Sequence, residues 1–593
     1  MKKIISLTLF FAIIISVQAQ VIDTARFRLE FRPMIINSQK INQPAVINDT
    51  VTGEVDFSYT ITPQEVDIVF EPSQVKPMKL APDVMKRYYR NFLKVGFGYP
   101  VTPLFDLYIH NPDNNKFSYG LGVHHFSAWA PQIGEKMKKY AYYPTSDTRV
   151  NAFFNRFFKN QTLYSSIGYT HKYANLYGYN SDTVSQYLDN YEDYYEKTYR
   201  DSINNSFHHA KAEIGLRSNY VLEDRKLKQD VRLKYDFIRT YKKDMENHIG
   251  LDSYLAYDSR FMKISGSQNY RLDFDLDYYN NRWNDSIVDS LGARRRVDNS
   301  FKMELKPTVN FTLGEYHFMF GVGLPVATAL GKTYVPIYPV AEVQLGLVPG
   351  ILSFYFGIDG DVKYNSLQNL LYDNPFVKPQ LDSLKFSRSQ IVLRAGVKGN
   401  LVKKLNYHIS ARYAFVKDDL FYVIDTNALL KNQFDVMYRD VNTLNVCVNL
   451  NWEVMSKLYL NLEGNYWGNF FDRVTDSVEE RAWYRPTWEV KFNGKYFYNN
   501  KMAFNLNCNL QFGRWANVPD FETNVFTAQK MKPLIDIGVG FEYFFSNRFT
   551  AFANINNLAC QNYARYYDFK SNGINVLVGI TYSFGDESLK RKK

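Results

Sequence analysis

The sequence predicts an all-β protein: a transmembrane antiparallel β-barrel of about 22 strands with a short extended N-terminal periplasmic or lumenal segment. Three observations support this fold class. Alternating apolar and polar residues recur from about residue 91 to the end of the chain, and a period of two is typical of strands. Short connections alternate with long polar ones. The 47 Tyr and 45 Phe residues are spread along the chain rather than gathered in helical stripes.

Residues 1–19 predict a cleaved signal peptide. Lys2 and Lys3 form a basic region, the apolar run Ile4–Ile15 follows, and small residues precede the expected cleavage site before Gln20. The alternative, an uncleaved membrane anchor, requires a longer apolar run than this one. We therefore expect an exported protein, and because no second long apolar run follows, we expect no transmembrane helix.

Residues 20–90 differ in kind from the rest of the chain. Prolines are scattered through them and alternation is brief, as in the stretch GEVDFSYTIT. This pattern predicts an extended periplasmic or lumenal segment without a full core of its own. The barrel is then expected to span residues 91–585.

The faces of the predicted strands identify their surroundings. In residues 271–279, RLDFDLDYY, leucines and aromatics share one side while arginine and aspartates share the other. In residues 354–364 the apolar side is expected to carry Phe354, Phe356, Ile358 and Val362, opposite Tyr355, Asp359, Asp361 and Lys363. A soluble β-sandwich also alternates, but its strands usually have about 5–6 residues. Spanning a bilayer takes about 9–11 residues, and the backbone must be fully paired, which requires a closed barrel.

The connections follow the order expected of such a barrel. Links such as 111–115 and 313–316 are short, which suits periplasmic turns, and most of the links between them are long enough for external loops. The predicted long loops are residues 129–146, 176–205, 284–299, 365–388, 416–437, 468–485, 513–530 and 559–572. An even strand number places both ends of the chain in the periplasm.

The polar faces supply candidate pore residues that we expect to line the lumen: Asp273, Asp275, Asp277, Asp359, Asp361, Arg394, Lys398 and Glu463. Two interpretations stay open. The aspartates could line a cation path or bind calcium, or they could pair with Lys and Arg on neighbouring strands as structural ion pairs.

No constellation of residues predicts an enzyme. His408, Ser410 and Arg412 share a strand face, but residues two apart on a strand lie roughly 6–7 Å from each other. That separation is too long for a direct Ser–His hydrogen bond. The adjacent histidines of His124–His125 and of His208–His209 point to opposite faces, so neither pair forms a compact metal site. We expect no catalytic residue, no bound metal and no cofactor.

The distribution of Lys and Arg along the chain indicates which classes of partner to expect. The net charge is +11, but Lys and Arg are dispersed and form no basic helical stripe, so we expect no nucleic-acid partner. Outer-membrane lipid is the expected surrounding. Tyr-rich loops such as residues 187–199 could contact periplasmic or outer-membrane protein partners, or could be ordinary surface.

The last predicted strand lies in GINVLVGITYSFGDESLKRKK, residues 573–593. Its apolar row is interpreted as lipid-facing, with Leu577 as the one apolar residue on the polar side. Residues 586–593 form a basic tail that we expect in the periplasm.

This ending resembles the last hairpin of TonB-dependent receptor barrels, in which an Asn-Leu pair precedes a Tyr-rich loop and a closing strand of the form G-x-T/S-Y-x-F. The matching closing-strand residues are Gly579, Tyr582 and Phe584. The beginning of the barrel, from Tyr89, looks like a barrel family of the Bacteroidota often labelled TonB-dependent receptor-like. The resemblance covers roughly residues 85–585 and implies an outer-membrane location.

The chain departs from that family in one respect. The resemblance implies a globular plug of well over a hundred residues before the barrel, whereas residues 20–90 are short and lack the expected pattern. The stretch YTITPQEV (59–66) is loosely like a TonB box, which gives little support for contact with TonB. Two functions follow as hypotheses: a transporter or pore for solutes, with residues 20–90 threading or gating the lumen, or a scaffold subunit of an outer-membrane complex.

Overall fold

The computed structural model divides the chain into two units, residues 1–84 and 85–593. The structure describes only part of the second unit: residues 89–111, 116–129, 145–178, 203–219, 227–261, 268–284, 287–289, 292–294, 296–381, 384–402, 404–428, 431–471, 480–520, 525–571 and 573–585. The predicted signal peptide, the tail and all but the last two residues of the segment 20–90 lie outside these ranges.

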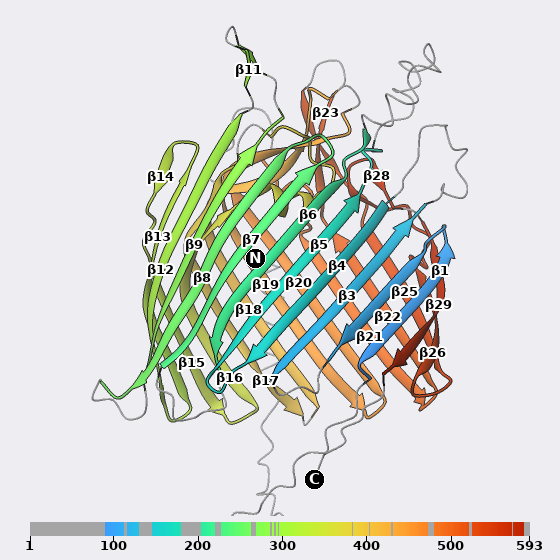
Figure 1. Ribbon diagram of the computed structural model, residues 1–593, viewed down its shortest axis with the longest axis horizontal. Helices are drawn as coiled ribbons and strands as arrows, with labels where there is room; N and C mark the ends of the chain where they lie inside the picture. Colours follow the sequence, from blue (N-terminus) through green and yellow to red (C-terminus); the bar gives the residue numbers. More distant parts are fainter. Residues whose placement is uncertain are drawn as a thin grey trace, which may run out of the picture. The chain divides into compact units, whose positions relative to one another are not determined.

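The described residues form a closed antiparallel β-barrel (Figure 1). The main sheet has 23 strands, of which the short β14 (Lys332–Tyr334) only extends a hairpin, so 22 strands build the wall. They are β1 (Asn91–Tyr99), β2 (Leu104–His110), β3 (Phe117–Ala128), β4 (Thr145–Phe157), β5 (Gln161–Tyr173), β6 (Phe207–Ser218), β7 (Leu227–Thr240), β8 (Met245–Ser259), β9 (Gln268–Arg282), β12 (Val297–Leu313), β13 (Tyr316–Ala329), β15 (Tyr338–Val348), β16 (Leu352–Tyr364), β17 (Phe386–Val402), β18 (Leu405–Ile424), β19 (Phe434–Met455), β20 (Leu458–Phe471), β21 (Trp488–Asn499), β22 (Met502–Phe512), β25 (Leu534–Phe544), β26 (Phe549–Asn556) and β29 (Asn575–Phe584).

The barrel closes where β1 pairs with β29, and the register runs from Asn91 opposite Phe584 to Tyr99 opposite Val576. Each of the other wall strands pairs with its neighbours along the chain, which satisfies the backbone on every side. The predicted fold class, including the strand number, is therefore confirmed.

The two ends of the barrel differ as predicted. Tight turns such as Leu313–Tyr316 lie at one end, the turn end. The other end, the loop end, carries the longer links and is uppermost in Figure 1. Three small hairpins decorate it: β10 (Ile287–Asp289) with β11 (Gly292–Arg294), β23 (Trp515–Pro519) with β24 (Phe526–Lys530), and β27 (Ala564–Tyr566) with β28 (Phe569–Lys570).

Some predicted loops are shorter than expected because strands continue past the membrane. The predicted loop 416–437 is wrong in its bounds, since β18 and β19 remain paired as far as Ile424 and Phe434. These strands have 20 and 22 residues, whereas about 9–11 residues cross a bilayer.

The outer surface of the wall is apolar and exposed. On β29, Val578, Ile580 and Tyr582 are 52%, 45% and 41% exposed, which fits the lipid-facing row predicted for this strand. Leu577, the one apolar residue on the opposite side of the strand, is 6% exposed and packs inside the barrel against Leu104 and Phe552.

One predicted face is wrong. Val362 was placed in the apolar outward row of its strand, but it is 1% exposed and belongs to the buried core inside the barrel. The pairing of β16 with β17 shifts between Asp359 and Asp361, which is a β-bulge. The alternation of faces breaks at this irregularity, so Val362 and Tyr364 turn inward to the core.

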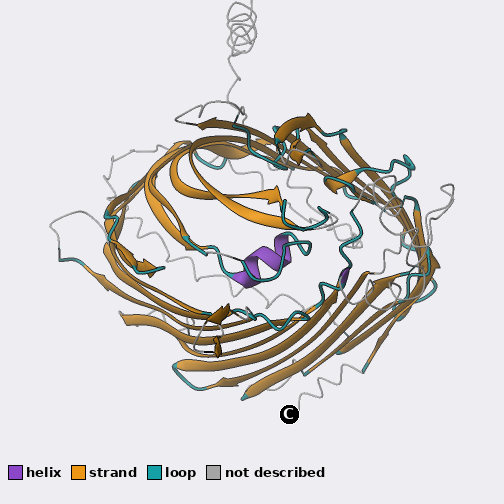
Figure 2. Cartoon of the chain, turned by 90° about the horizontal axis from the view of Figure 1, so that it is seen from above, coloured by secondary structure: helices purple, strands orange, loops and turns teal. Residues whose placement is uncertain are grey.

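The main hydrophobic core lies at the loop end, where a loop folds into the ring of strands. We call residues 365–385 the crossing loop; it joins β16 to β17 and contains α4 (Leu367–Asp373), the one helix among the described strands and loops that is long enough to name. Figure 2 shows α4 inside the ring of strands. Its buried Leu367, Leu370 and Leu371 pack in a cluster with residues from distant loops and strands, including Phe207, Trp283, Phe421, Phe434, Trp483, Tyr484, Tyr566 and Phe569.

Among the described helical residues, none forms a stretch of the length and hydropathy needed to cross a bilayer.

Candidate functional site

A cavity of about 710 Å³ on the inner face of the barrel collects most of the predicted lumen residues. It is lined by five carboxylates and five cationic groups, which together we call the charged wall. The carboxylates are Asp273, Asp275, Glu304, Asp359 and Asp361, and the cations are Arg271, Lys302, Lys306, Arg394 and Arg412. The charges balance, so the wall is strongly polar without a net sign.

Asp359 is the centre of the charged wall. Lys306 Nζ on β12 lies 3.1 Å from its Oδ1, and Arg394 Nη2 on β17 lies 2.7 Å from its Oδ2. One carboxylate thus holds two cations from different strands. Such an arrangement fixes side chains inside a wet lumen, where an isolated ion pair is worth little.

Two glycines make room for the Tyr338 ring on the inner face of the barrel, beside Lys306. The Tyr338 ring lies over Gly323 and Gly360, where an added Cβ would come within 2.1 and 2.3 Å of the ring. The Tyr338 hydroxyl donates a hydrogen bond to Glu304. Because glycine has no side chain, these two positions leave room for the Tyr338 ring. The Tyr338 hydroxyl in turn holds the Glu304 carboxylate of β12 in place.

A second group of pairs lies along β9 and β12. Arg271 donates to Asp273, with Nε 2.9 Å from Oδ1, and Lys302 Nζ lies 3.0 Å from Glu304 Oε2. Asp275 and Asp361 line the same cavity, yet within the described part of the chain neither makes a hydrogen bond or an ion pair. These two carboxylates are the ones that remain available to a solute.

The other three predicted residues lie away from the charged wall. Asp277 accepts a hydrogen bond from His248, with 2.8 Å between Oδ1 and Nε2. Lys398 Nζ donates to Gln344 Oε1 at 3.0 Å. Glu463 on β20 accepts from Asn465 at 2.9 Å and lies 3.7 Å from Lys491 Nζ. Five of the eight predicted residues thus share one cavity, and these three lie outside it.

A chain of hydrogen bonds connects the barrel wall to the crossing loop. Tyr372 on α4 bonds His209 Nδ1 at 3.0 Å, and His209 Nε2 lies 3.0 Å from Asp236 Oδ1. Asp236 Oδ2 lies 3.2 Å from His248 Nδ1, and His248 continues to Asp277. Burial raises the pKa of the Tyr372 phenol, so it stays a neutral hydroxyl that can donate.

Sequence reasoning missed this chain because its members come from four strands and a loop. The prediction that His208 and His209 face opposite ways agrees with their contacts: the His208 ring stacks on His171 at 4.5 Å, while His209 meets α4. His209 bonds Asp236 on the neighbouring strand β7, and this contact follows from the pairing register of β6 with β7, which the sequence alone does not give.

Backbone contacts hold the crossing loop on one side of the barrel. Glu246 on β8 accepts from the N–H groups of Leu367 and Gln368 at 2.7 and 3.3 Å, at the N-terminal end of α4, where carboxylates are favoured. Asn205 Nδ2 donates to the carbonyl of Val377 at 2.9 Å. These contacts come from the walls near β6 and β8.

Aromatic contacts hold the crossing loop on the other side. The rings of Phe376 and Phe569 stack with their centroids 3.8 Å apart, and Tyr566 donates to the carbonyl of Asp373 at 3.2 Å. Lys378 N donates to the Phe434 carbonyl at 2.8 Å. The loop is thus fastened to β19 and to the β27–β28 hairpin, and it spans the mouth between these anchors and β6–β8.

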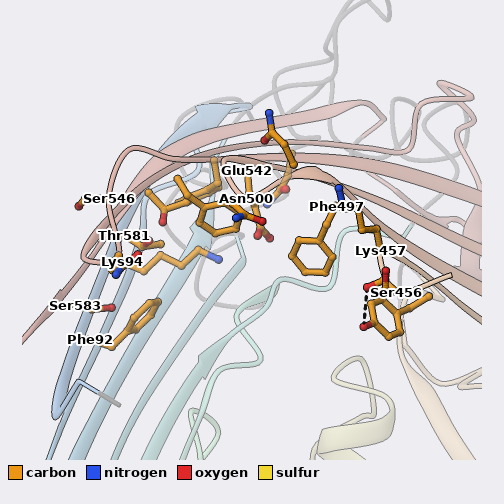
Figure 3. A pocket seen from close by; sticks show the side chains of 17 residues that line it. Phe92, Lys94, Ser456, Lys457, Phe497, Asn500, Glu542, Ser546, Thr581 and Ser583 are labelled. Atoms are coloured by element: carbon orange, nitrogen blue, oxygen red, sulfur yellow. Dashed lines mark hydrogen bonds between the residues drawn. The ribbon is translucent and has the colours of Figure 1, made fainter. Parts of the chain in front are cut away.

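A further cavity of about 880 Å³ lies inside the wall near the turn end (Figure 3). Lys94 lies over the Phe552 ring, 4.5 Å from its centroid, and Glu542, Phe497, Thr581 and Ser583 also line the space. Sequence reasoning did not foresee this cavity, which joins Thr581 and Ser583 of the last strand to residues of β1, β20, β21, β25 and β26.

The described residues contain no group of three or more His, Cys, Asp or Glu side chains arranged to hold a metal ion. His408, considered with Ser410 as a possible catalytic pair, instead bonds the Tyr355 hydroxyl at 2.8 Å through Nε2. That contact gives His408 a structural partner on β16.

Comparison by sequence gave no relatives: no protein-family model matches the chain, and no curated protein matches it. Comparison of structures gave clear similarities. FpvA of P. aeruginosa, solved in a complex with heterologous pyoverdine and iron, aligns with a TM-score of 0.62 at 11% identity, covering 84% of this chain and 72% of FpvA. The siderophore receptor PirA from Acinetobacter baumannii aligns with a TM-score of 0.63 at 11% identity, covering 83% of this chain and 80% of PirA. The copper transporter OprC aligns with a TM-score of 0.58 at 11% identity, covering 84% and 81%.

At this level of identity the similarity concerns the fold. It confirms that the chain has the barrel architecture of these receptors and of this transporter, as the resemblance of the last hairpin implied. Together with the apolar outer face, a closed wall of 22 strands identifies an outer-membrane β-barrel.

Proposed function

We propose that this protein is a transport barrel through whose lumen a solute crosses the outer membrane. The observation that carries the proposal is the continuous 22-strand wall around an inner surface of charged and amide side chains. Barrels of 16–18 strands leave an aqueous channel, and those of 22 strands enclose a wider lumen that transporters plug. A wall with this many polar inward groups suits a hydrated path better than a packed core.

The crossing loop supports a gated path rather than an open one. It is fastened on opposite sides of the mouth by Glu246 and Asn205 on one side and by Phe434 and Phe569 on the other. A solute that passes the loop end must displace these contacts. We therefore propose that the resting barrel is narrowed at the loop end and opens when a solute loosens the loop.

Asp275 and Asp361 are the proposed contact points for solute on the charged wall, because both line the cavity and neither is engaged by the described residues. Asp359, Arg394 and Glu463 are proposed to shape the wall through the ion pairs described above. Lys398 and Asp277 support neighbouring side chains.

Three parts of the proposal rest on sequence alone. Residues 20–90 are proposed to thread or gate the lumen in place of a full plug, and the chain is proposed to belong to the TonB-dependent receptor-like barrels of the Bacteroidota. We further propose that it has no enzymatic activity. The neighbours of similar fold named as receptors or transporters agree with the last proposal.

Conductance in planar bilayers tests the proposal. The chain without its signal peptide, the same chain lacking residues 20–84, and a variant with residues 367–381 replaced by a short Gly-Ser linker are compared. We expect the linker variant to show larger and more frequent currents than the chain with an intact crossing loop.

The alternative function, a scaffold subunit, predicts a different result. If none of the three forms conducts, and affinity purification from native membranes recovers partner proteins in fixed ratio, the transport proposal is wrong and the scaffold reading replaces it.

A further inference from the structure

Five asparagines form one row across the inner wall of the barrel. Asn406 on β18 lies opposite Asn451 on β19, which lies opposite Asn461 on β20. Asn461 lies opposite Asn493 on β21, and Asn493 lies opposite Asn507 on β22. The same residue type therefore occupies the same register position on five consecutive strands, and we call this row the asparagine ladder.

The ladder is partly joined by its own hydrogen bonds. Asn461 Nδ2 donates to Asn451 Oδ1 at 2.8 Å, and Asn493 Nδ2 donates to Asn461 Oδ1 at 3.2 Å. A side-chain amide has two N–H donors and an oxygen with two acceptor sites, so each member keeps unused capacity. The end members Asn406 and Asn507 are exposed, and within the described residues their side chains make no hydrogen bond.

The ladder lines a cavity of about 540 Å³ that also includes Asn505 and Tyr459. The charges at its rim are paired with each other: Lys404 Nζ lies 2.6 Å from Glu453 Oε1, and Lys495 Nζ lies 3.6 Å from Glu542 Oε2. The surface offered to a solute is therefore a neutral strip of amides, and the aromatic side chains Tyr459 and Trp452 also line the cavity. This side of the lumen contrasts with the charged wall of β9, β12 and β16–β18.

Such a strip suits a particular chemistry. A hydroxyl group donates and accepts, as an amide does, so a polyhydroxylated chain can exchange hydrogen bonds with successive asparagines without losing any. Neighbouring strands are about 4.8 Å apart, which repeats the amide at a spacing comparable to the length of one pyranose unit. An ionic solute would lose hydration at this strip without gaining an opposite charge.

We propose that the asparagine ladder is a binding strip for neutral, hydroxyl-rich solutes, namely oligosaccharide chains lying across β18–β22. The proposal rests on the transport function proposed above and names the class of solute that would use this side of the lumen. Tyr459 supplies an apolar ring for the face of a sugar, and the ladder supplies the hydrogen bonds.

Binding is tested separately from passage. The full-length protein in detergent is mixed with maltohexaose, and contact is measured by saturation-transfer NMR with titration for affinity. The double variant Asn461→Leu/Asn493→Leu removes the centre of the ladder and is expected to weaken binding about tenfold or more, since at least two hydrogen bonds are lost. Asn310 lines the cavity of the charged wall, away from the ladder, so Asn310→Leu is the control and should leave binding unchanged.

A milder variant guards against misfolding. Asn461→Gln/Asn493→Gln keeps the amides and should retain most of the binding, and heat-modifiable migration on gels reports whether each barrel is folded. The proposal is overturned if the folded wild-type protein does not bind maltohexaose, if the leucine variant binds as well as wild type, or if Asn310→Leu weakens binding equally.

A liposome-swelling assay with maltohexaose and with a charged tetrapeptide distinguishes the two proposals. If the peptide causes swelling but the sugar does not bind, the proposal that the ladder binds sugars is wrong and the transport proposal is retained. If the sugar binds but causes no swelling, even in the Gly-Ser linker variant, the transport proposal is wrong and the ladder is a binding site only.

Discussion

Gly96 of the first strand lies directly opposite Gly579 of the last strand, at the seam where the barrel closes. The Phe552 ring covers both glycines from the inside, with its Cζ 2.6 Å from the position of a Cβ added at Gly579. That Cβ would also lie 2.2 Å from the carbonyl oxygen of Val95. The glycine matched to the closing strand of receptor barrels thus has a physical role: it permits close approach at the seam.

Substitution of Gly579 by alanine should therefore destabilise the barrel. The carbonyl belongs to the paired backbone and cannot move without breaking the seam, so we expect a loss of about 1–3 kcal/mol in the free energy of unfolding. Urea unfolding in detergent, followed by gel migration, measures it. Gly464→Ala is the control, because no atom lies within 4 Å of the Cβ it would add. Equal stability of the two variants would contradict the role given to the seam.

Replacement of Glu246 should release the crossing loop. Its carboxylate accepts from two N–H groups of α4, and Glu246→Gln would turn an amide donor toward one of them. We expect the free energy of opening of residues 367–381 to fall by about 1–3 kcal/mol. Hydrogen–deuterium exchange of that segment measures the change.

Glu342→Gln is the matched control for this substitution, since Glu342 lies on β15 and makes no side-chain hydrogen bond within the described residues. If both variants exchange at the wild-type rate, Glu246 does not anchor the loop.

The parts of this structure that sequence predicts are those set by local pattern. Alternation along a strand places Asp273 and Asp275 on the side opposite Leu272 and Phe274, and the structure keeps that division. The face of a residue follows from its neighbours two positions away, so a single sequence suffices. The same local rule failed at Val362, because the pairing of β16 with β17 shifts just before it and the alternation of faces breaks there.

The parts that sequence does not predict depend on register and on distant segments. Lys306 on β12 meets Asp359 on β16 across β13 and β15, and no pattern within either strand predicts that contact. The ring stacking of Phe376 on Phe569 joins a loop in the middle of the barrel sequence to a hairpin near its end. The asparagine ladder likewise appears only when five strands are aligned by their pairing.

Neutralising Asp359 should change the selectivity of the lumen. In Asp359→Asn, Lys306 and Arg394 lose their shared carboxylate and present uncompensated positive charge to the cavity. We expect the reversal potential in a KCl gradient to shift toward anion preference, measured on the Gly-Ser linker variant of the crossing loop. The double variant Lys306→Gln/Asp359→Asn should restore most of the original value. An unchanged reversal potential in the single variant would place the charged wall outside the ion path.

The β27–β28 hairpin should hold the crossing loop more firmly at acidic pH. Burial raises the pKa of the Asp568 carboxyl, and nearby Lys570 offsets part of that rise. Because the pKa of Asp568 in the folded hairpin is above its unfolded value, the protonated form stabilises the fold below the unfolded pKa. This contribution is lost as pH rises through the folded pKa.

The variant Asp568→Asn removes this titration, and asparagine tolerates the positive φ of +61° at this position. We therefore expect hydrogen exchange of residues 564–570, corrected for its intrinsic pH dependence, to quicken from about pH 4 to pH 7 in wild type but not in the variant. Asp258→Asn, at the turn end, controls for the loss of one negative charge, and a wild-type hairpin whose corrected exchange does not change with pH would refute the assignment to Asp568.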